Sequence, residues 1–445
     1  MSRTLFGTDG IRGRVGQHPM TAEFALRLAS AAGRELAPDG GKVLIGKDTR
    51  VSGYMFESAL EAGFVAAGMD VLLVGPLPTP GIAYLTRTLG ADVGVVISAS
   101  HNPYEDNGIK FFDANGSKLS DAIESAIEAR LVEPSVTRES GFLGRAKRVE
   151  NALEAYQQFC ISTVPAAMRL DGLKIVIDCS HGAAYKVAPR VLSTLGAEIV
   201  PIGCSPNGRN INHNCGSTKP ELMRLTTLGV RADLGIALDG DGDRVLMVDH
   251  RGELIDGDQL LWVLASAWHS AGQLRGPVVG TLMSNLGLEH GLRDLGVDFR
   301  RARVGDRYVL EMLRETGGSL GGETSGHLIC LDKTTTGDGL ISALQVLSVM
   351  KQTGRTLAEL TAGMPRYPQI LINVRVRERI DLCNSAPIQS AVRQAESQLG
   401  GRGRVVLRAS GTEPVVRVMV EGDDDAEVEQ LAKAIAACVQ DAAPG

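Results

Sequence analysis

The sequence predicts an α/β fold with three similar mixed α/β domains around a central cleft, followed by a smaller C-terminal α+β domain. Three observations lead to this prediction. Short apolar strand-like stretches alternate with helical stretches, this alternation restarts twice, and the end of the chain orders its strands and helices differently. Alternation of this kind implies right-handed crossovers and largely parallel sheets. The length of 445 residues fits three or four domains of roughly 150 residues or fewer.

The first predicted unit, residues 1–150, opens with apolar residues at helical spacing between Thr21 and Leu36. The strand and helix signals that follow it are KVLIG (42–46), SGYMFESALEAGFVAAG (52–68), DVLLVG (70–75), ADVGVVIS (91–98) and IKFF (109–112).

The same alternation restarts in a second unit, residues 151–252, and in a third, residues 253–365. The second unit contains a helical stretch near 151–163 and then LKIVID (173–178), GAAYKVAPRVLSTLG (182–196), AEIVPIG (197–203) and ADLGIALD (232–239). The third unit contains DGDQLLWVLASAW (256–268), PVVGTL (277–282), SNLGLEHGLRDLG (284–296) and VGDRYVLEMLRETG (304–317).

The fourth unit, residues 366–445, has a different order, which indicates a small α+β domain. Its signals are QILINVRVRER (369–379), SAPIQSAVRQAESQLG (385–400), GRVVLRAS (403–410), PVVRVMVEG (414–422) and a final helix.

Composition and charge restrict the classes of partner. A hydrophobic fraction of 44% and a charged fraction of 22% are ordinary for a globular protein. The net charge of -6 argues against nucleic acid as a partner, so any anion must be bound by a local basic pocket. We expect no signal peptide, because the N-terminal MSRTLFGTDGIRG lacks a basic-then-apolar pattern, and no membrane segment, because no apolar run approaches about 20 residues. Seven widely spaced cysteines without a C-x-x-C pair predict reduced thiols and a cytoplasmic location.

Polar residues follow the apolar stretch at 93–97, in the sequence SASHNPYEDNG. Pro103 and the Asp-Asn-Gly that follows it predict a tight turn before the next strand begins. Ligands of open α/β sheets bind where strands end, so a serine on this turn, Ser100, is a candidate functional residue. The alternative is that Ser100, His101 and Asn102 only hydrogen-bond the backbone of their own turn.

Three aspartates alternate with glycine in DGDGDR, residues 239–244, directly after the stretch LGIAL. Their carboxylates repel one another, and hard oxygen ligands suit Mg²⁺ or Ca²⁺. An EF-hand is excluded, because Arg244 and His250 stand where that loop needs glycine and glutamate. A plain acidic turn remains the alternative.

Two further loops have binding chemistry. GGETSGH (321–327) offers a carboxylate, a hydroxyl and an imidazole that can bond sugar hydroxyls, although His327 on its own can equally be a structural histidine. RASGTEPVVR (408–417) places arginines around a glycine-containing turn, and guanidinium groups with turn N–H groups bind phosphate. The alternative for this second loop is an exposed basic turn.

One tempting motif is rejected. GKVLIGKD (41–48) nearly matches the P-loop, but Asp48 stands where that pattern needs Ser or Thr, and the spacer is strand-like. The sequence also contains no G-x-G-x-x-G, no G-x-S-x-G and no H-E-x-x-H.

Taken together, SASHNP, DGDGDR, GETSGH and RASGTEP resemble the motifs of the α-D-phosphohexomutase superfamily, in order and over essentially the whole chain. The stretches FGTDGIRG, TTTGDG and RASGTEPVVRVMVEG are most similar to its bacterial branch that acts on glucosamine phosphates. The resemblance implies reversible interconversion of glucosamine 6-phosphate and glucosamine 1-phosphate. It implies a phosphoserine enzyme and a 1,6-bisphosphate intermediate or activator, in a step that feeds UDP-N-acetylglucosamine synthesis for the cell envelope.

The resemblance also implies roles for individual residues. The phosphoserine would be Ser100, and its phosphate would hold one Mg²⁺ together with Asp239, Asp241 and Asp243. The implied catalytic residues besides Ser100 are Lys110 as general acid/base, His101, Arg12 and Arg244. The implied substrate-binding residues are Glu323, Ser325 and His327 for the sugar, and Arg408, Ser410, Gly411, Thr412 and Arg417 for the non-reacting phosphate.

Several alternatives stay open. A phosphomannomutase or phosphoglucomutase would use the same residues, and Thr324 in the sugar loop does not decide between these substrates. A non-catalytic phosphosugar-binding protein would not need Ser100 beside three aspartates. The resemblance allows a homodimer.

Overall fold

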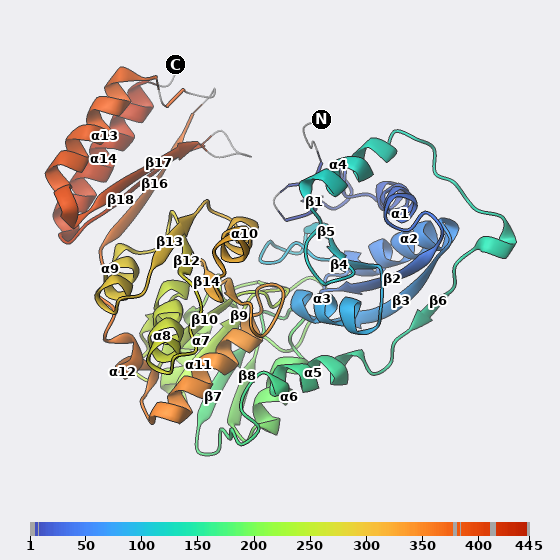
Figure 1. Cartoon of the computed structure of the whole chain (residues 1–445), viewed down its shortest axis with the longest axis horizontal. Coiled ribbons are helices and arrows are strands. Elements are labelled where there is room, and N and C mark those ends of the chain that lie inside the picture. Colours follow the sequence, from blue (N-terminus) through green and yellow to red (C-terminus); the bar gives the residue numbers. More distant parts are fainter. Residues whose placement is uncertain (1–4, 8, 377–380, 383, 410–414, 443–445) are drawn as a thin grey trace.

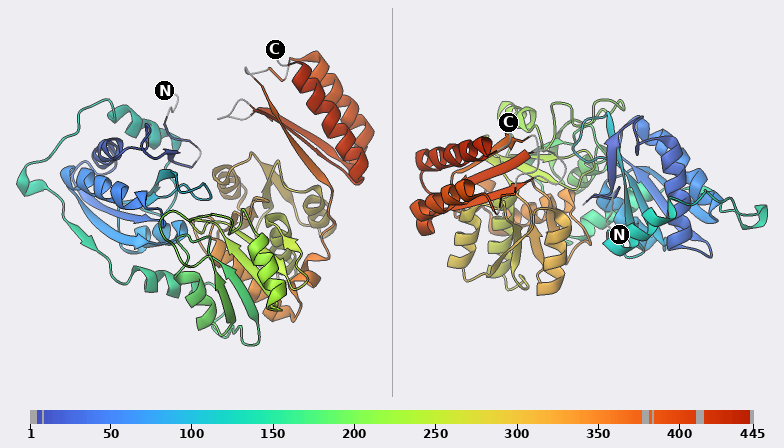
Figure 2. Two further views of the ribbon diagram at one scale, coloured as in Figure 1. Left: turned by 180° about the vertical axis from the view of Figure 1, so that it is seen from behind. Right: turned by 90° about the horizontal axis from the view of Figure 1, so that it is seen from above.

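The computed structural model describes the chain except residues 1–4, 8, 377–380, 383, 410–414 and 443–445. The described residues form four sheets, one for each predicted unit. The four units follow one another along a crescent, with the first and the fourth at its two tips (Figure 1). The views from behind and from above show the same arrangement (Figure 2). The predicted fold class is therefore confirmed.

Unit 1 has a six-stranded sheet in the order β1-β5-β4-β2-β3-β6. Its strands are β1 (Ile11–Arg14), β2 (Gly41–Lys47), β3 (Met69–Pro76), β4 (Val93–Ile97), β5 (Asp106–Asp113) and β6 (Ala146–Arg148). Its helices are α1 (Ala22–Leu36), α2 (Ser52–Ala66), α3 (Thr79–Thr88) and α4 (Asp121–Arg130), followed by the short helix η1 (Ser140–Phe142). Strands β2, β3, β4 and β6 run parallel, whereas β5 runs antiparallel to both β4 and β1.

Unit 2 has a five-stranded sheet in the order β11-β10-β9-β7-β8. Its elements are α5 (Ala152–Ser162), β7 (Lys174–Asp178), α6 (Val187–Thr194), β8 (Glu198–Ile202), α7 (Glu221–Gly229), β9 (Leu234–Leu238), β10 (Val245–Asp249) and β11 (Leu254–Ile255). Strand β11 carries this sheet past the predicted boundary at 252. The three predicted domain boundaries stay predictions.

Unit 3 has a four-stranded sheet in the order β13-β12-β14-β15. Its strands are β12 (Val278–Thr281), β13 (Phe299–Ala302), β14 (Leu320–Gly322) and β15 (Leu328–Cys330). Its helices are α8 (Gly257–Ser270), α9 (Leu286–Asp294), α10 (Asp306–Thr316), α11 (Gly339–Thr353) and α12 (Leu357–Thr361).

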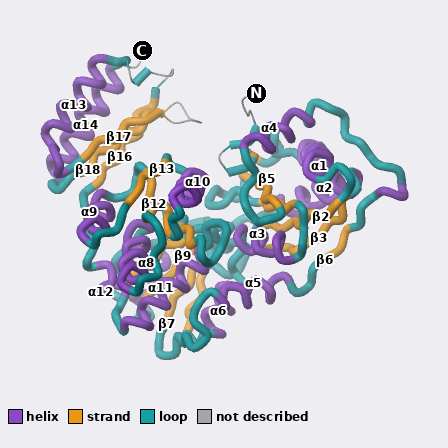
Figure 3. The backbone as a smooth tube through the Cα atoms, viewed as in Figure 1, coloured by secondary structure: helices purple, strands orange, loops and turns teal. Residues whose placement is uncertain are grey.

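Unit 4 has a three-stranded antiparallel sheet in the order β16-β18-β17 with both of its long helices on one face (Figure 3). Its elements are β16 (Gln369–Arg375), α13 (Ala386–Leu399), η2 (Gly400–Arg402), β17 (Arg404–Ala409), β18 (Val415–Glu421) and α14 (Asp425–Asp441).

Local sequence signals explain where helices of unit 3 begin and end. Helix α8 starts with a capping box, in which Asp256 and Gln259 each accept a hydrogen bond from the other's backbone N–H. Helices α10 and α11 end at Gly317 and Gly354, both in the left-handed conformation that glycine adopts without steric cost.

The hydrophobic core joins units 1, 2 and 3 but not unit 4. One continuous buried cluster contains Ile82 of α3, Ile177 of β7 and Leu344 of α11. The buried residues of unit 4 form a separate cluster between its sheet and its two helices. Units 1 to 3 therefore pack as one body, whereas unit 4 has a core of its own.

Each of the first three sheets contains an antiparallel hairpin, where the sequence predicted largely parallel sheets. The hairpins are β4–β5, β9–β10 and β14–β15. The connections within them are the polar loops that the sequence singled out, at 98–105, 239–244 and 323–327. A short polar turn suffices for an antiparallel pair, whereas a parallel pair needs a long crossover.

In the part of the chain that the structure describes, no helix combines the length and the apolar character that crossing a membrane requires.

Asp338 joins two helices in the interior. Its carboxylate accepts the Ile341 N–H at 2.9 Å as the N-cap of α11, and it accepts the hydroxyl of Tyr156 from α5 at 2.8 Å. Both side chains are fully buried.

We predict that Asp338→Ala lowers the free energy of unfolding by about 2–4 kcal/mol, because it removes the cap and leaves the buried Tyr156 hydroxyl unpaired. The matched variant Tyr156→Phe removes one hydrogen bond and should cost only about 1 kcal/mol. Urea and thermal unfolding measure both variants. Equal losses for the two would contradict the capping role.

Candidate active site

Ser100 lies on the turn between β4 and β5 and is almost completely buried. Its backbone has φ +51°, a left-handed conformation that is rare for residues other than glycine. The Ser100 hydroxyl donates to Asp239 Oδ2 at 2.6 Å and lies 3.2 Å from His101 Nδ1. The turn of unit 1 therefore presents its serine directly to the acidic turn of unit 2.

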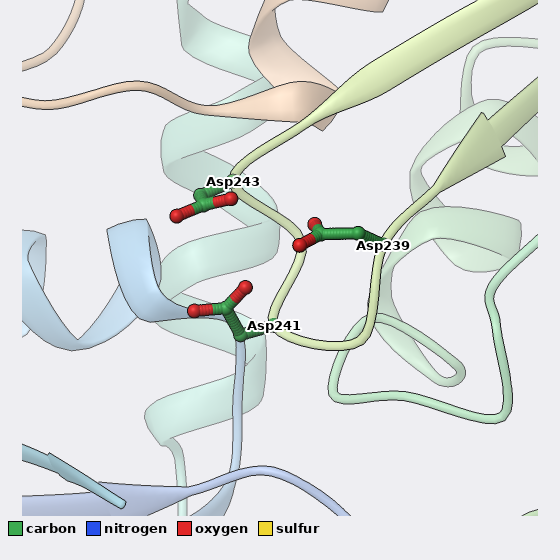
Figure 4. Close-up of side chains that lie close together, drawn as sticks. All are labelled: Asp239, Asp241 and Asp243. Carbon is green, nitrogen blue, oxygen red and sulfur yellow. The ribbon is translucent and has the colours of Figure 1, made fainter. Parts of the chain in front are cut away.

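Asp239, Asp241 and Asp243 occupy the turn between β9 and β10 and gather their carboxylates on one side of it (Figure 4). All three are buried, and one oxygen from each lies within 4.8 Å of the others. Burial and the charges of Asp243 and Asp241 raise the pKa of Asp239 well above its usual range.

The acidic turn fits a hard divalent cation. Asp241 Oδ1 and Asp243 Oδ1 are buried and have no hydrogen-bond partner, which is costly for charged oxygens unless a cation binds them. An all-oxygen donor set of this kind suits Mg²⁺.

Lys110, in β5, is the nearest cation to these aspartates. Its ammonium lies 2.8 Å from Asp241, 2.9 Å from Asp9 and 3.9 Å from Asp243. Burial disfavours the charged form, but Asp241, Asp9 and Asp243 outweigh it and raise the pKa of Lys110. In this arrangement Lys110 holds its proton, which opposes a role as a base.

Two arginines lie near the Ser100 turn. Arg12 in β1 contacts the carbonyl oxygen of Ala99 at 3.4 Å, and the Arg244 N–H donates to Asp239 Oδ1 at 3.1 Å. The Nε atoms of both guanidinium groups are buried without a hydrogen-bond partner. Burial and the two positive charges lower the pKa of His101 to about 4, so its ring is neutral at neutral pH. Both arginines can therefore bind an anion at Ser100, whereas the three aspartates beside it oppose one unless a cation is bound.

The sugar loop of unit 3 reaches the acidic turn through His327. This buried ring lies 3.7 Å from Asp243 and 3.6 Å from Asp306. Burial opposes the charged form, but the carboxylates, Asp243 first, raise the pKa of His327 to about 9. Glu323 accepts the Gly305 N–H at 3.0 Å, while Ser325 is exposed.

Thr324, which left the substrate undecided in the sequence, uses its hydroxyl within the protein. It donates to Asp258 Oδ2 at 2.7 Å, and the same oxygen accepts the Asn285 N–H at 2.8 Å. Asp258, in the first turn of α8, thereby ties the sugar loop to the segment that leads into α9.

The phosphate loop is described only at its edges, because Ser410, Gly411 and Thr412 lie outside the described residues. Arg408 of β17 and Arg417 of β18 are cross-strand partners. Burial and the neighbouring charge of Arg417 lower the pKa of Arg408, and Glu323 of unit 3 opposes this shift. Two adjacent cations of this kind attract an anion.

Sequence reasoning missed three residues that the structure brings to the site. Asp9 lies 2.6 Å from Lys118 as well as contacting Lys110, and Lys118 also pairs with Asp306 at 2.5 Å. Thr79, the first residue of α3, donates to Asp241 at 2.7 Å. Asp9 lies within FGTDGIRG, where a signal existed, but neither Thr79 nor Lys118 stands in a motif.

Comparisons with known proteins agree with this geometry. Four models of the phosphoglucomutase/phosphomannomutase family match the chain in order, namely alpha/beta/alpha domain I at residues 3–136, domain II at 153–252, domain III at 256–367 and the C-terminal domain at 371–437. The chain belongs to this family. The predicted resemblance is confirmed, and the chain is an isomerase of the phosphohexomutase type.

Individual relatives refine the likeness. The chain is 58% identical to a phosphoglucosamine mutase of Methylococcus capsulatus, covering 99% of both chains, and 60% identical to one of Nitrosococcus oceani, covering 98% and 97%. A solved phosphoglucomutase/phosphomannomutase family protein of Burkholderia thailandensis matches at TM-score 0.83 and 25% identity, over 99% and 98% of the chains. An N-acetylphosphoglucosamine mutase of Aspergillus fumigatus, solved with GlcNAc-6P and magnesium, shares the fold at TM-score 0.70 and 19% identity, over 99% and 96%.

The mutase fold should show a pH dependence through Asp258. Burial and then the charge of Asp256 raise the pKa of Asp258 from 3.8 to about 7. A raised pKa means that this group's stabilisation is complete below pH 3.8 and is lost as the pH rises through about 7.

We therefore predict that Asp258→Asn becomes more stable relative to the unmodified chain, by roughly 2–4 kcal/mol, between about pH 4 and pH 8. Thermal unfolding across this range measures the difference, with Asp39→Asn, an exposed carboxylate, as control. A difference that stays constant with pH would refute the assignment.

Proposed function

We propose that this enzyme is a phosphoglucosamine mutase that interconverts glucosamine 6-phosphate and glucosamine 1-phosphate and supplies UDP-N-acetylglucosamine synthesis. The observation that carries the chemistry is the 2.6 Å bond between the Ser100 hydroxyl and Asp239 of a buried aspartate turn. The glucosamine substrate is supported by the names of relatives 54–60% identical over nearly the whole chain.

In this proposal Ser100 carries the phosphate that is transferred. Asp239, Asp241 and Asp243, with the Ser100 phosphate, would hold one Mg²⁺, whose charge would stabilise the transferring phosphoryl group. Arg12 and Arg244 would bind the oxygens of that group, and neutral His101 would support the serine turn. Protonated Lys110 would supply a proton as the bond to Ser100 breaks.

The other two loops would orient the sugar. Glu323, Ser325 and His327 would bond its hydroxyl groups, while Arg408, Ser410, Gly411, Thr412 and Arg417 would bind the phosphate that does not react. The 1,6-bisphosphate would turn around between two half-reactions, because either end must reach Ser100. The same bisphosphate would serve as activator.

We further propose a cytoplasmic enzyme, in agreement with the free state of the six cysteines that lie in the described segments. Nucleic acid and membrane are not proposed as partners, and a homodimer follows from the family resemblance alone.

A comparison of substrates tests the proposed function. ³¹P NMR should follow the Mg²⁺-loaded enzyme, primed with a trace of hexose 1,6-bisphosphate, on glucosamine, glucose and mannose 6-phosphates in parallel. We expect the amino sugar to form its 1-phosphate fastest. Preference for glucose or mannose would keep the mechanism and change the substrate, and no turnover of any of them would overturn both.

Ser100→Ala should abolish turnover of all three sugars, because no phosphate can be carried at that position. Phosphopeptide mapping should locate phosphate on Ser100 of the unmodified chain alone. A Ser100→Ala variant that still interconverts the isomers would remove the phosphoserine from the mechanism.

The metal assignment has a separate readout in stability. When a chelator removes the metal, Asp239→Asn should have a melting temperature at least as high as that of the unmodified chain, because it removes one of three repelling carboxylates. Mg²⁺ at about 100 times its Kd should stabilise the unmodified chain by about 2.7 kcal/mol and the variant by much less. An exposed replacement, Asp298→Asn, serves as control. Equal stabilisation of Asp239→Asn and the unmodified chain would count against the site.

A further inference from the structure

The segment that nearly matched a P-loop packs directly behind the Ser100 turn. Arg50, just after β2, is fully buried. Its guanidinium donates to the carbonyl oxygens of Ser100 at 3.2 Å and Asn102 at 2.6 Å, and it forms an ion pair with Asp48. This arginine therefore contacts the backbone on both sides of His101.

Asp48, the ion-pair partner of Arg50, fixes the backbone N–H of Ser100 through Ser98. Asp48 accepts the hydroxyl of Ser98 at 2.5 Å, and the Ser98 oxygen accepts the backbone N–H of Ser100 at 2.9 Å. The N–H and the C=O of Ser100 are thus both fixed by one buried ion pair.

Unit 2 also donates to the same two carbonyl oxygens. The side-chain amide of Asn212 donates to Ser100 O at 2.9 Å and to Asn102 O at 3.0 Å. Asn212 is itself anchored to its unit, because its backbone N–H donates to Ser180 O at 2.8 Å. Each oxygen therefore receives one donor from unit 1 and one from unit 2.

These contacts explain how Ser100 keeps its left-handed backbone. A non-glycine residue at φ +51° persists only where its surroundings over-determine it, and such conformations gather at functional sites. A relaxed backbone at this position would turn the hydroxyl away from Asp239. The direction of the Ser100 side chain thus depends on groups that do not touch it.

We propose that Arg50, Asp48 and Asn212 are positioning residues, which hold Ser100 in its left-handed conformation so that its oxygen faces the aspartate turn during phosphoryl transfer. This role rests on the proposed function of Ser100. Because it aligns the reacting oxygen and does not bind the sugar, its loss should lower kcat and leave KM nearly unchanged.

Asn212→Gly is the sharpest test. Glycine tolerates the φ of +59° at this position, so the variant removes the two hydrogen bonds without new backbone strain. We expect kcat for glucosamine 6-phosphate and the single-turnover rate of Ser100 phosphorylation by glucose 1,6-bisphosphate to fall about 10- to 100-fold. KM and the Mg²⁺-induced rise in melting temperature should stay within about twofold of the original values.

A matched control lies two residues away. Asn214 is also left-handed, at φ +54°, but it is exposed, and among the described residues its amide approaches only His213, at 3.5 Å. Asn214→Gly should keep the original kcat. Arg50→Lys keeps the charge beside Asp48 but loses the fork that reaches two carbonyls, so it should also lower kcat.

Unchanged kcat in both Asn212→Gly and Arg50→Lys would overturn the positioning role, as would a loss in Asn212→Gly no larger than in Asn214→Gly. If the unmodified chain itself fails to carry phosphate on Ser100, the proposed function fails and this role fails with it. A loss of kcat in the variants beside normal labelling of the unmodified chain supports both.

Discussion

The repulsion among three buried aspartates is the constraint around which the rest of the site is arranged. Each loses the stabilisation of water, and each raises the energy of the others. Lys110 pairs with Asp241 and His327 lies near Asp243, while Asp241 Oδ1 and Asp243 Oδ1 have no hydrogen-bond partner. Those oxygens are the part of the charge that protein groups leave uncompensated, and a divalent cation with a phosphate would complete the balance.

That charge balance draws on three units because each contributes one hairpin. Ser100, the aspartates and His327 belong to three separate sheets, and they come together because the turns of β4–β5, β9–β10 and β14–β15 meet. A shared hydrophobic core fixes these three turns relative to one another. The fourth hairpin, β17–β18, belongs to a unit with its own core, and its contacts with unit 3 include polar ones such as Arg404 with the carbonyls of Leu282 and Ser284. The turns that carry Ser100, the aspartates and His327 thus share one core, whereas unit 4, for which we propose phosphate binding, has a separate core.

The sequence could single out those candidate residues that lie within motifs. Three aspartates at alternating positions, and a serine after a buried strand, have local signals because their chemistry is local. Thr79 and Asn212 had none, since their partners lie 162 and 112 residues away along the chain. The antiparallel hairpins were missed for a related reason: an apolar stretch indicates a strand but not the direction of its neighbour.

The rejected P-loop illustrates the difference between a pattern and a role. Its spacer forms β2, as the sequence predicted, and the carboxylate of Asp48 follows directly after it. The positions of Asp48 and Arg50 in the fold place them beside the main chain of the turn that carries Ser100. Asp48 and Arg50 form an ion pair in the interior. Arg50 also donates to the carbonyl oxygen of Ser100, while Asp48 accepts the Ser98 hydroxyl, whose oxygen accepts the Ser100 N–H. A buried ion pair is weak evidence for stability, since burial costs much of what the attraction gains. The contribution that we propose for this ion pair is orientation. Its fixed donors and acceptors hold Ser100 in a conformation that its own backbone disfavours.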